Sequence, residues 1–165
     1  MARGKKPLLE NIEIKKIAAE GKSIAYVDEK VLFVPNTVPG DIVDVQVTRK
    51  RKSFLEGFIV NVRKYSDIRT EPFCSHFGVC GGCKWQNLPY QLQTEFKQQE
   101  IVDNLQRIGK VELQNVSPII GSPKTTYYRN KLEYTFCNKR FLTREEIANG
   151  QDIDRTPAVG FHVPG

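Results

Sequence analysis

Residues 39–62 read PGDIVDVQVTRKRKSFLEGFIVNV, and this stretch decides the fold. Pro39-Gly40-Asp41 has the composition of a turn. The strand predicted after it has apolar residues in partial alternation with polar ones: Ile42, Val43, Val45 and Val47. A second strand is predicted from Phe54 to Val62, with three apolar residues on one face: Phe54, Phe58 and Val60. The pattern therefore predicts two consecutive strands joined by a short basic connection.

The sequence before this pair predicts three more short strands. The first contains Ile12 and Ile14, and residues 23–27 and 31–34 form two others joined by a turn at 28–30. Five short strands in about 55 residues, with Gly and Pro turns between them, are typical of a small closed barrel of the oligonucleotide-binding (OB) type. A two-sheet sandwich is the competing architecture.

Basic residues are concentrated in the first part of the chain, whose net charge is +6 over 165 residues. Residues 1–70 contain 14 Lys and Arg against nine Asp and Glu, whereas residues 71–165 contain 11 against 10. Such a basic domain is typical of proteins that bind nucleic acid or an anionic membrane, and a lysine-rich solvated surface is the alternative.

Four consecutive cations lie on the predicted connection before Phe54: Arg49, Lys50, Arg51 and Lys52. Phosphate groups would supply the counter-charge that these side chains need. Lys15 and Lys22 are expected to assist them. Small barrels bind single strands on a face where aromatic side chains stack on bases. The candidate aromatic residues are Tyr26, Phe33 and Phe54, although core packing is the favoured interpretation of each.

Residues 74–83 contain three of the four cysteines, in the spacing C-x5-C-x2-C: Cys74, Cys80 and Cys83. Thiolates are soft ligands that favour zinc or an iron–sulfur cluster over calcium or magnesium. A turn with three free thiols is the other alternative. Because no secretory signal and no membrane-spanning apolar run is present, the cluster indicates a metal site in a reducing, cytoplasmic environment.

The sequence after the cysteines predicts a helix at about 88–108. Apolar residues recur there at helical period: Leu92, Phe96, Ile101, Leu105 and Ile108. Asn87 is the expected N-cap and Gly109 the expected stop. We expect the apolar stripe to pack in a core.

The last part of the chain predicts two strands and a short helix. Alternation predicts a strand over 127–137, and another is expected at 159–163. Between them, Thr143 and Glu146 have the spacing of a capping box, which opens a helix. The sequence ends at Gly165 directly after a predicted strand, so we expect it to be a fragment.

An ordered set of motifs carries a resemblance to a known family: Gly21–Ala25, Val31–Pro35, Pro39–Asp41, Ser66–Pro72, Cys74 and Cys80–Cys83, Trp85-Gln86, Tyr90, Lys97 and Tyr128–Lys131. This set resembles the N-terminal part of the RNA 5-methyluridine methyltransferases, the S-adenosylmethionine-dependent uracil-5 methylases of ribosomal and transfer RNA. The most specific piece is Cys-Gly-Gly-Cys followed by Trp-Gln.

The resemblance implies a mainly β fold with some α structure. It implies a five-stranded OB-like TRAM barrel at residues 1–65, a cysteine loop and helix forming an iron–sulfur module at 66–109, and a truncated β-rich RNA-binding domain from 110–165. It also implies that Cys74, Cys80 and Cys83 bind a [4Fe–4S] cluster whose fourth cysteine lies beyond the chain. Without that ligand, the fragment is expected to lack the cluster or to hold zinc or a labile cluster instead, while Cys137 is expected to be an ordinary half-buried strand residue.

The resemblance further implies that the chain is the RNA-recognition part of a 23S rRNA (uracil-5-)-methyltransferase. The domain that holds S-adenosylmethionine and the nucleophile would lie outside the sequence, so the fragment is expected to be inactive. Arg129 and Lys131 are expected RNA contacts. Ribosomal RNA is the first expected partner and transfer RNA the second, and we expect a monomer without membrane contact. A free-standing RNA-binding metalloprotein and a redox protein are the alternatives.

Overall fold

A computed structural model describes the chain in three stretches: residues 6–150, 152–153 and 155–162. The chain divides into two compact units. The first combines residues up to Glu71 with Trp85–Pro123, and the second combines Pro72–Lys84 with the residues from Lys124 onward. No helix within the described stretches is long and apolar enough to cross a membrane.

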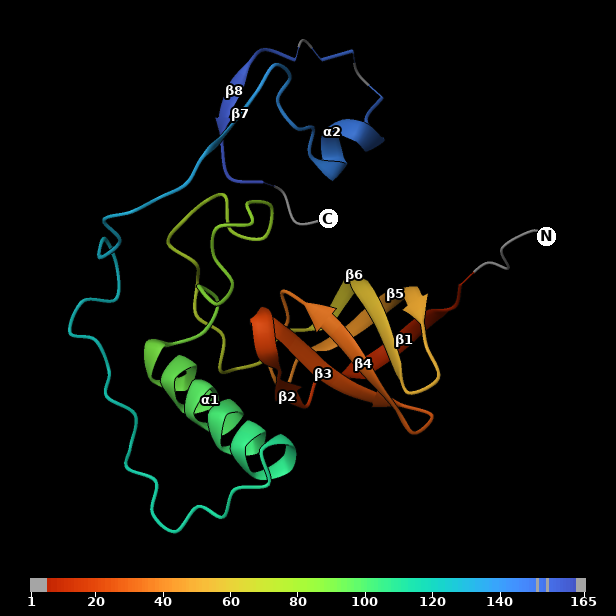
Figure 1. The fold of residues 1–165 in the computed structure, drawn as a ribbon. Helices are drawn as coiled ribbons and strands as arrows, with labels where there is room; N and C mark the ends of the chain where they lie inside the picture. Colours follow the sequence, from red (N-terminus) through yellow and green to blue (C-terminus); the bar gives the residue numbers. More distant parts are fainter. Residues whose placement is uncertain (1–5, 151, 154, 163–165) are drawn as a thin grey trace. The chain divides into compact units, whose positions relative to one another are not determined.

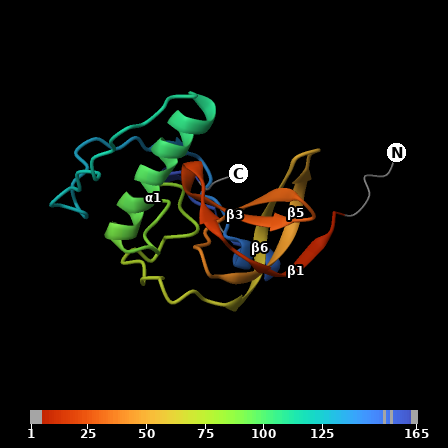
Figure 2. The ribbon, with the colours of Figure 1, turned by 90° about the horizontal axis from the view of Figure 1, so that it is seen from below.

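Six strands of the first unit form one curled sheet (Figures 1 and 2): β1 (Leu8–Glu13), β2 (Lys16–Ile17), β3 (Lys22–Val27), β4 (Lys30–Pro35), β5 (Ile42–Lys50) and β6 (Phe54–Lys64). Their order is β1-β5-β6-β4-β3-β2, and every neighbouring pair is antiparallel except β4 and β6. A 3-10 turn, η1 (Ala19–Gly21), precedes β3. Because β1 and β2 are consecutive in the chain but lie at opposite ends of this order, the sheet curls round on itself.

The predicted number of five strands is wrong, because the first predicted strand is in fact two. Ile14 lies between β1 and β2 and is only 1% exposed. Its amide donates to the carbonyl of Asp41 (2.9 Å), and its own carbonyl accepts from the amide of Gly40 (2.8 Å). The amide of Lys15 then donates to the carbonyl of Ile24 (2.8 Å). These bonds redirect the chain from one edge of the sheet to the other.

Apolar side chains fill the inside of the curled sheet: Ile14, Ala25, Leu32, Val34, Val43, Val45, Val47 and Leu55. Inward residues alternate with outward ones along β3 and β4, as the two-residue period of β structure requires, whereas register shifts interrupt the alternation in β1, β5 and β6. Strands β5 and β6 lie close together at Gly57, where a Cβ atom would lie 2.7 Å from the carbonyl oxygen of Gln46. A side chain at Gly57 would therefore push the two strands apart.

The helix of the first unit is α1 (Tyr90–Asp103), which continues as a π-helical turn, η2 (Asn104–Ile108). The helix predicted at 88–108 is therefore present. The predicted core packing of its apolar stripe is wrong in the described part of the chain, because no residue of α1 or η2 is buried and Ile101 and Ile108 are 57% and 79% exposed.

The start of α1 also differs from the prediction. The N-cap position belongs to Pro89, and no side chain caps the helix. Asn87, the predicted cap, is instead 1% exposed, and its backbone carbonyl accepts a hydrogen bond from the amide of Thr70 (3.1 Å). Proline is tolerated at a helix start because its missing N–H would have no partner within the helix there.

The second unit contains β7 (Thr135–Cys137), α2 (Arg144–Ala148) and β8 (Ala158–Gly160), with β7 and β8 antiparallel. The strand predicted from residue 127 is wrong for 127–134, because within the described chain no strand pairs with those residues to bind their backbone groups. Val163, the end of the last predicted strand, lies outside the described residues.

The predicted capping box at the start of α2 is confirmed. The hydroxyl of Thr143 accepts from the amide of Glu146 (3.2 Å), and the Glu146 carboxylate accepts from the amide of Thr143 (2.8 Å). Arg140 adds two charge-assisted bonds to the same carboxylate, at 2.8 and 3.1 Å. These bonds, the one from Arg140 first, lower the pKa of Glu146 to about 2.

Candidate nucleic-acid interface and cysteine loop

The outer face of the curled sheet carries aromatic side chains beside cations. One row across four neighbouring strands consists of Ile24, Phe33, Glu56 and Arg49. The next row consists of Tyr26, Val31 and Phe54. Since the residues that alternate with these fill the core, the two rows lie on the outside.

The interpretation of the three aromatic residues as core is wrong. Tyr26 is 57% exposed, and neither Phe33 nor Phe54 belongs to the buried core. The rings of Phe33 and Phe54 meet edge to face with centroids 6.0 Å apart, and the guanidinium carbon of Arg49 lies 6.0 Å from the Phe54 centroid. The narrow inside of the sheet is filled by smaller aliphatic neighbours such as Leu55, which leaves the rings outside.

The four cations predicted on one connection do lie together at the end of the β5–β6 hairpin. Arg49 and Lys50 end β5, and Arg51 and Lys52 form the turn, which is closed by the bond from the Arg51 amide to the carbonyl of Phe54 (2.8 Å). All four residues are exposed. A compact positive loop therefore borders the aromatic face.

The other two predicted barrel cations are paired with acids. Lys15 pairs with Glu13. Lys22 lies 3.7 Å from Glu20 and 4.0 Å from Glu56, and Arg49 also contacts Glu56, at 3.5 Å. Lys22 and Arg49 are thus joined through one carboxylate on the outer face.

A buried ion pair attaches the linker that follows the barrel. The side chain of Asp41 is fully buried, and Arg69 binds it with two parallel hydrogen bonds of 2.8 and 2.7 Å. The amides of Val38 (2.8 Å) and Ser66 (3.0 Å) also donate to this carboxylate. The sequence pattern did not reveal this pair, although Pro39–Asp41 and Arg69 both belong to the motifs that carry the family resemblance. The pair fixes the linker against the sheet.

A second carboxylate, that of Asp44, is also held by hydrogen bonds within the first unit. It accepts from the amide of Asn11 (3.0 Å), the side-chain amide of Asn61 (3.3 Å) and Nε of Arg63 (2.7 Å). These bonds, the one from Asn11 first, hold the pKa of Asp44 below its ordinary value. Asp44 links β1, β5 and β6, so its role is structural.

The cysteine loop is folded by short backbone bonds. The amide of Phe77 donates to the carbonyl of Cys74 (3.0 Å), and the amide of Cys80 donates to that of His76 (2.9 Å). The amide of Gly82 points at the sulfur of Cys80 (3.4 Å), and Sγ of Cys74 lies 4.0 Å from Nδ1 of His76. These contacts fold residues 74–82 into successive turns around the cysteines.

The donor set of this loop fits a thiolate-bound metal or cluster by its chemistry. Three thiols, none of them in a disulfide, lie within ten residues. In the stretches that the structure describes, no three His, Cys, Asp or Glu side chains are arranged to hold an ion. The assignment of Cys74, Cys80 and Cys83 as ligands therefore stays a prediction.

The cysteine loop contacts the segment that follows β8. The amide of Gly81 donates to the carbonyl of His162 (2.9 Å). The ring of Phe161 lies against Gly82, where a Cβ atom would come within 3.0 Å of it. Gly82 therefore permits a close approach that a side chain would hinder. These contacts join two distant parts of the chain within the second unit.

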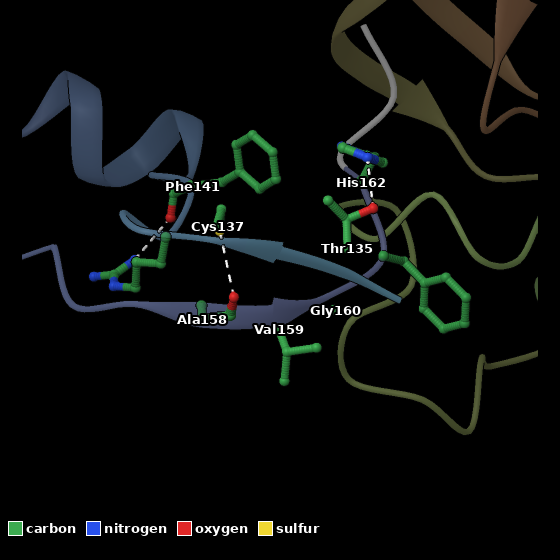
Figure 3. Close-up of a pocket in the computed structure, with 9 residues that line it drawn as sticks. Thr135, Cys137, Phe141, Ala158, Val159, Gly160 and His162 are labelled. Carbon is green, nitrogen blue, oxygen red and sulfur yellow. Dashed lines mark hydrogen bonds between the residues drawn. The ribbon is translucent and has the colours of Figure 1, made fainter. Parts of the chain in front are cut away.

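A pocket of about 150 Å³ lies beside β7 and β8 (Figure 3). The Thr135 hydroxyl is 2.9 Å from Nε2 of His162, and the thiol of Cys137 donates to the carbonyl of Ala158 (3.5 Å). Cys137 is half-buried in β7, so its predicted structural position is confirmed. Its thiol is engaged with a backbone carbonyl of the neighbouring strand.

The two predicted RNA contacts of the second unit are both exposed. Lys131 pairs with Glu133 at 3.1 Å. Arg129 has no ion pair among the residues that the structure describes. The strand expected to carry both residues is absent, so their assignment to RNA stays a prediction.

The TRAM domain family matches residues 10–60, which contain most of the curled sheet. Among curated proteins, the chain is 55% identical over 149 residues to an "Uncharacterized RNA methyltransferase" of Bacteroides thetaiotaomicron, covering 90% of this chain and 33% of that protein. It is 36% identical over 163 residues to the "23S rRNA (uracil(1939)-C(5))-methyltransferase RlmD" of Francisella tularensis subsp. novicida, covering 92% of this chain and 36% of that protein.

Among solved structures, the chain is similar to the Pyrococcus abyssi tRNA (uracil-54, C5)-methyltransferase in complex with S-adenosyl-L-homocysteine. The TM-score is 0.42 at 26% identity, over 70% of this chain and 24% of that one. The chain spans about a third of the length of the curated relatives described above. It carries a TRAM domain and belongs to the RNA methyltransferase family of these relatives, of which it represents the N-terminal part.

Proposed function

We propose that this chain is the RNA-recognition part of an S-adenosylmethionine-dependent 23S rRNA (uracil-5-)-methyltransferase. The observation that carries the proposal is the outer face of the TRAM sheet, where the exposed ring of Tyr26 and the half-buried rings of Phe33 and Phe54 lie beside a loop of four cations. The names of the relatives support RNA methylation as the activity of the whole protein and ribosomal RNA as its substrate.

The proposed binding has an electrostatic and a stacking component. Arg49, Lys50, Arg51 and Lys52 bind phosphates, which gives affinity without sequence preference. The exposed ring of Tyr26 and the pair of Phe33 and Phe54 offer surfaces on which bases stack. Arg129, Lys131, Lys15 and Lys22 are proposed as further RNA contacts.

Catalysis is proposed to belong to the part of the relatives' length that this chain does not span, together with S-adenosylmethionine. The chain alone would then transfer no methyl group. Cys74, Cys80 and Cys83 are proposed to hold a [4Fe–4S] cluster, or zinc in its place, which would cross-link the loop. The boundaries at 1–65, 66–109 and 110–165, a monomeric state and a cytoplasmic location complete the proposal.

The test replaces the four loop cations by alanine and measures binding to single-stranded RNA over a range of salt concentrations. The slope of log affinity against log salt should fall by about 0.7 for each lost phosphate contact on a single strand, equally for different sequences. The control removes four exposed cations elsewhere: Lys16, Lys84, Arg107 and Lys139. A slope unchanged by the loop variant, or equal losses in both variants, would contradict the proposal.

A further inference from the structure

The carboxylate of Glu56 lies among the cations and aromatic rings of the outer face, where Lys22 also has Glu20 as a neighbour at 3.7 Å. Glu56 lies on β6 between its ladder partners, Phe33 of β4 and Arg49 of β5. Its two oxygens face different cations: Oε2 is 3.5 Å from Nη1 of Arg49, and Oε1 is 4.0 Å from Nζ of Lys22. Cations from strands on either side of β6 thus share one anion.

The contacts of Glu56 with Arg49 and Lys22 are long enough for another anion to replace the carboxylate. Both distances exceed the roughly 2.7–2.9 Å of a strong charge-assisted hydrogen bond. The side chains remain accessible, with 51% of Arg49, 40% of Lys22 and 30% of Glu56 exposed. Exposed ion pairs of this kind contribute little stability, because water screens them. A competing anion can therefore displace the carboxylate at small cost to the fold.

The surroundings of Glu56 favour a phosphate from a single strand as that anion. A phosphodiester carries one negative charge and two terminal oxygens, as a carboxylate does. Phe54 lies two residues away on the same face, in edge contact with Phe33 and 6.0 Å from the guanidinium of Arg49. A base stacked on these rings would place its own phosphate beside the two cations.

We propose that Glu56 takes the place of an RNA phosphate in the free barrel, holding Lys22 and Arg49 in position until RNA displaces it. The inference rests on the proposed RNA-binding function and adds to that surface a carboxylate that competes with RNA for the two cations. Glu56 lowers the affinity of the barrel for any polyanion, so only a strand that also stacks on the aromatic rings binds well.

The experiment compares Glu56→Gln with the unchanged chain in binding a fluorescently labelled oligouridylate at several salt concentrations. We expect affinity to rise about three- to tenfold at low salt. The salt slope should steepen by about 0.7 for each cation that is freed to meet a phosphate of a single strand. The matched control is Glu10→Gln, which changes the net charge equally and removes a carboxylate 3.9 Å from Arg63, away from this surface.

A second pair of variants tests whether the gain in affinity comes from freeing Lys22 and Arg49 or from the change in net charge. In a chain that already carries Lys22→Ala and Arg49→Ala, Glu56→Gln should give little further gain, because no paired cation is left to free. Equal gains in Glu56→Gln and Glu10→Gln, or weaker binding by Glu56→Gln in a folded chain, would overturn the inference while leaving RNA binding intact. Absence of oligouridylate binding by the unchanged chain would overturn the proposed function and this inference with it.

Discussion

The two units of the chain are stabilised by different interactions. Every buried apolar side chain among the described residues belongs to the first unit, and all but Val38 and Leu88 of these form one cluster inside the curled sheet. The described part of the second unit has no buried residue, and Tyr127 and Phe136 are 94% and 84% exposed. The first unit therefore has the apolar core of a stable domain, whereas the residues described in the second unit form none.

The described part of the second unit is held together by polar contacts and by the cysteine loop. Arg140 and Thr143 hold the carboxylate of Glu146, and the amide of Gly81 binds the carbonyl of His162. Hydrogen bonds exposed to water contribute little net stability, because water competes for both partners. Small units without a core are usually stabilised by a metal, disulfides or contact with another domain. Metal removal is therefore expected to destabilise the second unit, and core substitutions are expected to destabilise the first.

The largest expected effect is on the second unit and concerns its thiols. Serine at Cys74, Cys80 or Cys83 should abolish metal binding and remove amide protection throughout the second unit, because metal binding to such a site is also folding free energy. Metal content and visible absorption of the full-length protein made anaerobically, together with hydrogen exchange, measure these changes. The barrel should keep its protection.

Cys137→Ser is the matched control for the three thiol variants, since the Cys137 thiol binds the Ala158 carbonyl in the β7–β8 pair. It should retain the metal and the visible colour. Bleaching by Cys137→Ser, with colour retained in the other three variants, would show that the ligands are assigned wrongly.

The next effect belongs to the first unit. Arg69→Ala leaves the fully buried carboxylate of Asp41 without its cation, which should destabilise the barrel by about 3 kcal/mol. Urea unfolding followed by circular dichroism measures this loss. Arg69→Lys keeps the charge but not the pair of parallel bonds, so its loss should be smaller. A loss of less than 1 kcal/mol (about a fivefold change in the folding equilibrium) in Arg69→Ala would mean that the two amides alone satisfy Asp41.

Alanine at one glycine in each unit tests the difference in packing between the two units, because each substitution adds one methyl group. Gly57→Ala forces a Cβ against Val45 and the carbonyl of Gln46 in the closely packed sheet, which should cost about 1–3 kcal/mol. Gly160→Ala places its methyl in open space in β8 and should change stability by less than about 0.5 kcal/mol. Thermal unfolding of both variants gives the comparison, and equal costs would contradict the packing difference.

The sequence was sufficient to predict the parts of the barrel in which local chemistry and hydrophobic pattern agree. The turn at Asp28-Glu29 has positive φ at both residues and joins β3 to β4, as its polar composition indicated. Periodicity alone could not show which aromatic residues face outward. It also could not show the bend at Ile14, which depends on hydrogen bonds to the distant residues Gly40 and Asp41.

The candidate site was predictable only where neighbouring residues in the sequence determine the arrangement. The cations at 49–52 are contiguous, so any hairpin brings them together. The role of Glu56 depends on the register of three strands, and the Asp41–Arg69 pair joins residues 28 positions apart. In the second unit, alternation over 127–134 predicted a strand that is absent, because a strand requires a partner as well as a pattern.

The smallest expected effect is a pH-dependent loosening of α2 in the second unit. Hydrogen bonds from Arg140 and Thr143 lower the pKa of Glu146 from 4.5 to about 2 in the folded chain. The stabilisation is therefore complete above pH 4.5 and is lost as the pH falls towards 2, because a protonated carboxyl group no longer holds Arg140. Hydrogen exchange at the Glu146 amide, which binds the Thr143 hydroxyl, should quicken over this interval relative to its intrinsic rate. In Glu146→Gln the amide should be less protected at pH 4.5 and show no such step, because glutamine does not titrate. A Glu146 amide equally protected at both ends of the interval would mean that the Thr143 cap alone fixes the start of α2.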